Sequence, residues 1–218
     1  MPRISPQPAT DWSPEARAVF DSFRDAARSG VPAAPAPAPG GGAAADAATT
    51  DVAAAGAADD GPSGANVFGT LARHPALAEA FLAFNGHVLY GSSLPPRLSE
   101  LLILRVAALR RCGYEWAQHA LRAQDFGITA EEIARVVEGP AAPGWSATDR
   151  TLLAAVDELL AGAAVGATTW AALAGFLDER QLMDVVATVG AYDLVAMMFL
   201  SFGVEPDPDI VAYLPEGW

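Results

Sequence analysis

The residues of this chain that could do chemistry are concentrated between Glu100 and His119. Glu115 and His119 are four positions apart, so they share a face if they lie on one helix. Cys112, the only cysteine, precedes Glu115 by three residues at the expected start of that helix. Glu100 belongs to the preceding segment and reaches the same place if the two helices pack antiparallel. The spacing therefore predicts a group of two carboxyls, one imidazole and one thiol.

These side-chain types are suited to proton transfer. A carboxylate beside a histidine raises the imidazole pKa and fixes its tautomer, which favours a general acid or base. A thiol at a helix N-terminus is biased toward thiolate by the helix dipole and the backbone N–H groups. Simpler interpretations are open too: Cys112 as a small buried apolar residue, Glu115 and His119 as a solvated helix pair, and Glu100 as an exposed first-turn residue.

A metal site is less well supported. Glu100, Glu115 and His119 are possible ligands of a divalent ion, but the other two histidines, His74 and His87, lie on earlier segments without ligand spacing. One cysteine permits neither an internal disulfide nor a cysteine-based zinc site. We therefore expect no metal, with His74 as a helix cap and His87 on a helix surface or interface.

The segments that must position these residues have helical spacing, and no stretch alternates with period two for long enough to form a strand. Proline, capping residues and glycine mark the boundaries, as in Ser13-Pro14 at one start and Gly203 at the last end. Helices are expected at 14–29, after Asn66, at 75–90, 96–111, 114–126, 129–138 and 146–160, from 168 or 169, and at 179–202. The expected fold is all-α.

Composition divides the chain into three parts. Residues 31–64 are almost entirely Ala, Pro, Gly, Asp and Thr. Such a segment cannot bury enough surface to offset its ordering entropy, so it is expected to be a disordered linker. Residues 1–30 then form an N-terminal helical segment, and residues 65–218 form the main helical domain.

The totals limit the partners. A chain of 218 residues suffices for one domain with a sizeable core, and its net charge of -13 argues against a broad basic surface for nucleic acid or an anionic membrane. The N-terminus lacks the apolar core of a signal peptide, and the apolar runs fall short of the roughly 18 residues that span a bilayer. With a single cysteine, we expect a soluble protein of the reducing cytoplasm.

Around the reactive residues the sequence resembles the carboxymuconolactone decarboxylase and alkylhydroperoxidase-D-like family. That family's pattern is a Glu, a Cys-x-x-Cys twelve residues later, and a His four residues after the second Cys. Glu100, Cys112, Glu115 and His119 fall at those spacings, with Glu115 in place of the second cysteine. The resemblance covers about 66–207 and is strongest over 91–137. It implies a compact helical domain of the alkylhydroperoxidase-D-like type.

The replaced cysteine excludes one branch of that family. A dithiol peroxidase needs a resolving thiol to condense with the sulfenic acid, and the chain has no second cysteine. The resemblance then implies a cofactor-independent lyase that carries out proton transfer or decarboxylation on a small carboxylated or lactone substrate. The alternatives are a non-catalytic helical scaffold or small-ligand-binding protein and, least favoured, a one-cysteine peroxidase using an external thiol.

The resemblance also implies roles for the central residues. His119 would be the general acid or base, and Glu115 would be its partner or a second proton-transfer group. Glu100 would orient the histidine or act as the base. Cys112 would be a packing residue at a family position or a bystander.

Further residues would complete the site. Tyr114 and Trp116 would shape a substrate pocket. Arg105 could bind a substrate carboxylate through its bidentate fork, with a surface or interface salt bridge as the alternative. Family members are small subunits that oligomerise, and the very apolar stretch 182–204 is consistent with a homo-oligomer, the alternative being a monomer that buries it.

Overall fold

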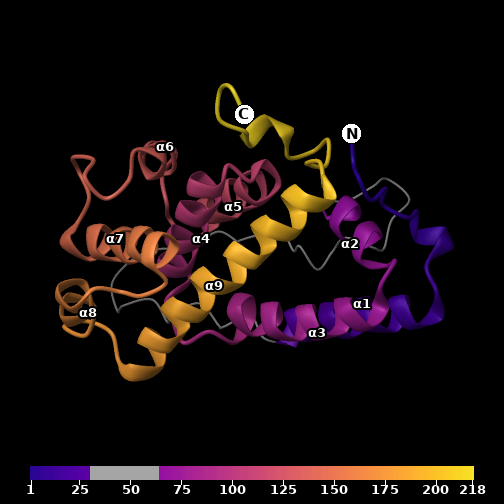
Figure 1. Ribbon diagram of the computed structural model, residues 1–218, viewed down its shortest axis with the longest axis horizontal. Helices are drawn as coiled ribbons and strands as arrows, with labels where there is room; N and C mark the ends of the chain where they lie inside the picture. The colour runs from indigo at the N-terminus through magenta and orange to yellow at the C-terminus, as the bar shows by residue number, and fades with distance from the viewer. Residues whose placement is uncertain (30–63) are drawn as a thin grey trace, which may run out of the picture.

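The computed structural model describes residues 1–29 and 64–218, so the predicted linker 31–64 lies, apart from Gly64, outside the described residues. All regular structure in the described ranges is helical, which confirms the predicted all-α class (Figure 1). The helices are α1 (Pro14–Ser29), α2 (Ala65–Leu71), α3 (Pro75–Gly86), α4 (Pro96–Arg110), α5 (Gly113–Asp125), α6 (Ala130–Glu138), α7 (Ala147–Gly162), α8 (Ala167–Leu173) and α9 (Glu179–Phe202). A π-helical turn, His87–Gly91, follows α3, and 3-10 turns lie at Ala9–Asp11 and Val211–Tyr213.

Helix α4 lies at the centre of the fold. It packs against α9, α5, α7 and α6, and α9 crosses in front of it in Figure 1. Every residue of α4 from Ser99 to Ala107 is buried. Leucine, isoleucine and valine occur on all sides of this helix, and a helix that is apolar all round is stable only where neighbours cover it completely.

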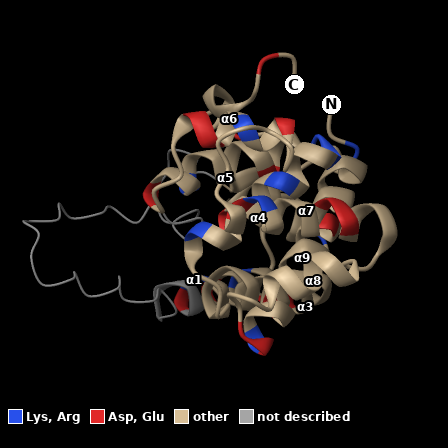
Figure 2. Ribbon diagram, turned by 90° about the vertical axis from the view of Figure 1, so that its left-hand side faces the viewer, with Lys and Arg blue, Asp and Glu red and all other residues tan. Residues whose placement is uncertain are grey.

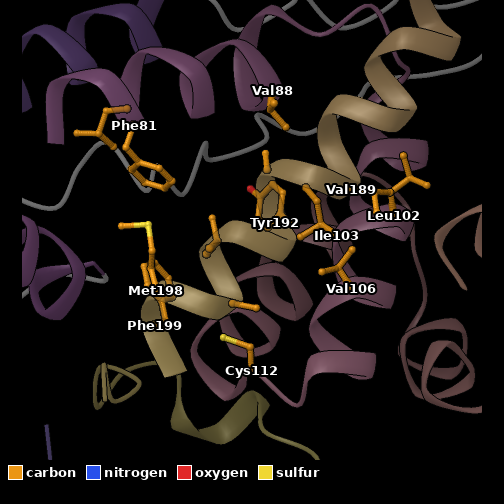
Figure 3. Close-up of a cluster of buried hydrophobic side chains, with 14 of the residues drawn as sticks. Phe81, Val88, Leu102, Ile103, Val106, Cys112, Val189, Tyr192, Met198 and Phe199 are labelled. Carbon is orange, nitrogen blue, oxygen red and sulfur yellow. The ribbon is translucent and has the colours of Figure 1, made fainter. Parts of the chain in front are cut away.

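Two hydrophobic cores lie on different sides of α4. The larger joins α4 to α9, α3 and α1 and contains Phe20, Leu102 and Tyr192 (Figure 3). The smaller lies between α4, α5, α6 and α7 and contains Leu101 and Trp116. Leu101 and Leu104 face the smaller core, whereas Leu102 and Ile103 face the larger one, because residues three or four apart share a helix face.

Most helix ends follow the predicted signals, although α8 begins at Ala167 after Gly166 and not at Thr168 or Thr169. Thr129 and Glu132 form both hydrogen bonds of a capping box at the start of α6, and the His74 side chain caps α3. The helix expected over 75–90 ends at Gly86 because the chain changes to a π-helical turn there. The helix expected after Asn66 begins at Ala65, since the Asn66 side chain donates to the Glu205 carbonyl instead of capping it.

Helix α9 combines a buried face with an apolar exposed one. By length and composition it is the single helix in the described part of the chain that could cross a membrane. In this fold, 44% of its most apolar 18-residue stretch is buried. Its outward side chains range from 40% to 71% exposed: Met183, Val186, Leu194, Met197 and Leu200. Over the whole protein, Figure 2 shows the charged residues as short blue and red segments, separated by long tan stretches of uncharged residues. In this structure α9 is a core helix packed along α4.

Arg105 connects α4 to α6 and α7. Its Nε and Nη2 donate to the Asp157 carboxylate at 2.7 and 2.9 Å, and its Nη1 donates to the carbonyls of Val136 and Val137 at the end of α6. A Cβ on Gly139 would lie 2.6 Å from Nη2, so the glycine leaves room for the guanidinium. Arg105 therefore forms a structural salt bridge, the alternative considered from the sequence. Its guanidinium N–H groups are used within the fold and are not free to bind a substrate carboxylate.

We expect Arg105→Met to lower the free energy of unfolding by about 3 kcal/mol, the lower end for breaking a buried ion pair, because Asp157 keeps some contact with water. Urea denaturation measures the change, and the exposed Arg150→Met on α7 is the control. Unchanged stability would contradict this structural role.

Candidate functional site

Glu100 and His119 meet where α4 and α5 pack against each other. Glu100 Oε2 lies 2.7 Å from His119 Nδ1, and the other carboxylate oxygen accepts from Arg122 Nε at 2.9 Å. Both members of the Glu100–His119 pair are buried. The turn between the helices allows this packing: Arg111 adopts the left-handed conformation, and Cys112 N donates to the Ala107 carbonyl.

The hydrogen bond fixes the form of the imidazole. A carboxylate accepts but does not donate, so the proton of this bond lies on Nδ1 and the lone pair of the neutral ring lies on Nε2. Among the described residues, no hydrogen bond to His119 Nε2 is found. The Tyr192 ring contacts the imidazole edge-on at 5.0 Å between centroids. His119 is thus held in one orientation with one basic nitrogen available.

His119 lines a cavity of about 70 Å³ in the larger core. Helices α3, α5 and α9 contribute most of the lining, and α1 adds Phe23. Figure 3 shows Phe81 of α3 pointing toward α9, which carries Tyr192 and Phe199. The lining residues are mostly aromatic and aliphatic, with a few polar groups: Phe23, Gly64, Val67, Phe68, Phe81, Leu82, Asn85, Leu89, Tyr114, Glu115, Gln118, His119, Tyr192, Val195 and Phe199.

Glu115 lines the same cavity and is almost completely buried. Neither carboxyl oxygen has a hydrogen-bond partner among the described residues. Burial raises the pKa of Glu115 well above its ordinary value; the thiol of Cys112 opposes this shift and the charge of Asp193 adds to it. Burial therefore favours the neutral carboxylic acid form of Glu115. Glu115 is not the hydrogen-bond partner of His119, a position that Glu100 occupies.

Cys112 is buried in the larger core, where Figure 3 shows it, and it does not line the cavity. Burial, followed by the Glu115 carboxylate, raises the pKa of this thiol to about 12. The backbone N–H groups of Glu115 and Tyr114 lower the pKa, as a helix N-terminus should, but burial outweighs them. The expected bias toward thiolate was therefore wrong at this position.

The two aromatic residues predicted to shape a pocket point in different directions. Tyr114 lines the cavity, and its hydroxyl donates to Asp207 Oδ2 at 2.9 Å. Trp116 packs in the smaller core, where its Nε1 donates to the Tyr213 carbonyl and its ring contacts Trp218. Residues two apart on a helix face nearly opposite directions, so one side of α5 could not place both in the cavity.

Three residues near the site were missed from the sequence. Arg122 follows His119 by three positions on the same helix face, a spacing that could have identified it. Asn85 is the one amide side chain in α3, and Tyr192 is the one tyrosine in α9. Such residues attract notice, but their spacing does not show that they face α5.

Solved structures share this fold. An alkylhydroperoxidase-D core protein of Ralstonia eutropha, described as an uncharacterized peroxidase-related protein, is 18% identical with a TM-score of 0.61, covering 69% of this chain and 82% of its own. A putative antioxidant defence protein of Agrobacterium tumefaciens is 17% identical with a TM-score of 0.59, covering 63% and 94%. The debrominase Bmp8 is 12% identical with a TM-score of 0.67, covering 96% and 95%. The alkylhydroperoxidase-D-like helical fold is thereby confirmed.

A family model matches the sequence of the central helices. It is the model of the carboxymuconolactone decarboxylase family, and the matched residues are 75–158, from α3 into α7. The matched segment includes Glu100, Cys112, Glu115 and His119, so the predicted resemblance is confirmed. No curated protein sequence matches the chain.

Replacing Glu115 should change how stability depends on pH. Its raised folded-state pKa means that the folded protein holds a proton that the unfolded chain releases near pH 4.5. The stability contributed by the neutral carboxyl is complete below that pH and is lost as the pH rises to the folded pKa, by about 1.4 kcal/mol per pH unit. Glutamine does not titrate, so the variant lacks this loss. The unfolding free energy of Glu115→Gln minus that of the parent should therefore rise by about 1.4 kcal/mol per pH unit over this range.

Urea denaturation at a series of pH values measures that difference, with the exposed Glu131→Gln as the control for loss of a carboxyl. A difference that stays flat from about pH 5 to about pH 8 would mean that Glu115 ionises normally.

Cys112 should be nearly inert in the folded protein. Because burial keeps the thiol protonated, iodoacetamide at pH 8 should alkylate it at least about a hundredfold more slowly than in the urea-unfolded chain. Mass spectrometry of the Cys112 peptide measures both rates. Equal rates would restore the one-cysteine peroxidase as a candidate.

Proposed function

We propose that this protein is a cofactor-independent enzyme that transfers a proton next to the carbonyl group of a small lactone-type substrate. One observation carries the proposal: a buried carboxyl, Glu115, whose oxygens have no hydrogen-bond partner in the described part of the chain, lines the same cavity as a histidine held by a carboxylate. A base and a neutral hydrogen-bond donor are the two groups that enolate formation requires.

In the proposed reaction, Nε2 of His119 removes a proton from the carbon next to the carbonyl. The electrons of the broken C–H bond form a carbon–carbon double bond, and the carbonyl electrons move to oxygen. Glu115 donates a hydrogen bond to that oxygen, as a carboxylic acid kept neutral in an apolar site can do. The imidazolium then returns the proton to the same or a conjugated carbon, which exchanges or isomerises the substrate.

Glu100 acts through the histidine and is a positioning residue. Its carboxylate holds the Nδ1 proton, stabilises the imidazolium formed in the reaction, and is itself held by Arg122. Changing it to an amide would leave the ring in place but remove the charge that favours the protonated state.

Decarboxylation uses the same stabilisation of an enolate. The electrons of the bond to the carboxylate move toward the carbonyl, carbon dioxide leaves, and protonated His119 supplies a proton to the carbon. The family name favours this reaction. Proton transfer is our first choice because decarboxylation needs a bound substrate carboxylate, and the described cavity lining includes no arginine.

Peroxidase chemistry has less support. The peroxidase-related descriptions belong to the neighbouring structures, and likeness at their identities concerns the fold. In this chain the single thiol is buried, has a raised pKa and lies outside the cavity lining.

Incorporation of deuterium from heavy water into α-angelica lactone, followed by proton NMR, tests the proposal. We expect His119→Ala to lower the exchange rate by about 10² to 10⁴-fold and Glu115→Leu by about 10² to 10³-fold. Glu100→Gln should shift the pH–rate profile, which a purely structural role would not do. Carboxymuconolactone in parallel, with release of carbon dioxide as the readout, tests decarboxylation.

The exposed Glu131→Gln is the control and should match the parent. Exchange that is unchanged in both His119→Ala and Glu115→Leu, or turnover of neither lactone, would overturn the proposed function.

A further inference from the structure

Two buried polar groups in the cavity wall lack hydrogen-bond partners within residues 1–29 and 64–218. They are the amide oxygen of Asn85 and the carboxyl group of Glu115, both of whose oxygens are unpaired there. Asn85 comes from α3 and Glu115 from α5, and both line the cavity. An unpaired buried polar group is destabilising, so a ligand that pairs both groups recovers that cost on binding. Asn85 offers an acceptor, and neutral Glu115 offers a donor.

The cavity also lacks a fixed cation. None of its described lining residues is an arginine, and His119 is the one lining side chain that can become positive. Arg122, three residues from His119, is already bound to Glu100 and lies over the rings of Tyr90 and Phe126. Arg105 is bound to Asp157. A carboxylate entering this cavity would therefore find no guanidinium to replace its water.

The surroundings of the cavity disfavour negative charge. Burial, with the charge of Asp207 adding to it, raises the pKa of Tyr114 well above its ordinary value. Burial, followed by the charge of Glu100, does the same to the pKa of Tyr192. Burial also raises the pKa values of Glu115 and Cys112. The burial and acidic neighbours that keep these groups protonated apply to a substrate carboxylate as well, and the net charge of -13 acts in the same direction at longer range.

We propose that this cavity selects small uncharged carbonyl compounds, which accept a hydrogen bond from Glu115 and donate one through an N–H or O–H group to Asn85, and that it rejects carboxylates. This specificity rests on the proposed function in taking the cavity as the substrate site. It makes Asn85 a substrate-binding residue and narrows the substrate class to neutral lactones, amides and hydroxy-carbonyl compounds.

The size of the cavity agrees with this class. Its volume of about 70 Å³ is roughly half that of the 150 Å³ apolar cavity known to hold benzene. The aromatic walls favour a flat, apolar body, so the polar atoms of the ligand must be few and must be paired. A carbonyl with one neighbouring donor satisfies both conditions.

Three probes of five heavy atoms each separate charge from hydrogen bonding. Propionamide carries the carbonyl and the N–H donor, propionate has the same shape with a negative charge, and 2-butanone has the carbonyl without a donor. Titrations followed by backbone amide NMR shifts give the dissociation constants. At pH 7 we expect propionamide to bind at least about tenfold more tightly than propionate and several-fold more tightly than 2-butanone.

Two variants assign the contacts. Asn85→Leu should remove the advantage of propionamide over 2-butanone and leave 2-butanone unaffected. Glu115→Leu should weaken both probes, because both carbonyls use the same donor. Gln124→Leu on α5, outside the cavity lining, is the matched control and should leave all three constants unchanged.

Equal or tighter binding of propionate would overturn the proposal, and so would the absence of any saturable shift with propionamide. An Asn85→Leu variant that keeps the preference for propionamide would remove Asn85 from the site. These outcomes are distinct from failure of the proposed reaction. Selective binding of propionamide without lactone exchange would support the specificity and contradict the proposed reaction. Lactone exchange with preferred binding of propionate would support the reaction and contradict the specificity.

Discussion

The hydrogen bond between Glu100 and His119 is the interaction on which the rest of the site depends. It joins the central helix α4 to α5, fixes the imidazole tautomer and, through Arg122, balances a buried carboxylate with a cation. A buried charge is costly unless it is paired and hydrogen-bonded, and this carboxylate has partners on both oxygens. The same pairing occupies Arg122, so the described cavity lining offers one basic nitrogen, on His119, and no guanidinium.

The spacing of the sequence predicted the elements of the site better than its electrostatics. The sequence placed Glu115 and His119 on one helix face and a turn at Cys112. These two features predicted that α4 and α5 bring Glu100 and His119 together. The pattern of apolar residues and capping signals likewise predicted α9 from Glu179 to Phe202 without error. Local rules suffice here because caps and helix faces involve residues only three or four apart.

Long-range partners could not be predicted in this way. Arg105 finds its carboxylate 52 positions away at Asp157, and Asn85 reaches the cavity only because α3 packs beside α5 and α9. The state of Cys112 depended on the balance of two opposing effects, the helix N-terminus and burial. Sequence position establishes the first, but only the packed core shows that the second is larger.

Part of the cavity wall comes from outside the segment that carries the chemistry. Phe23 on α1 closes one side, yet α1 precedes the segment 75–158 that matches the family. Glu100, Glu115 and His119 all lie within that segment. The shape of the cavity can therefore be redesigned at Phe23 without altering Glu100, Glu115 or His119. The size of the accepted molecule and the reaction performed on it are separable engineering targets.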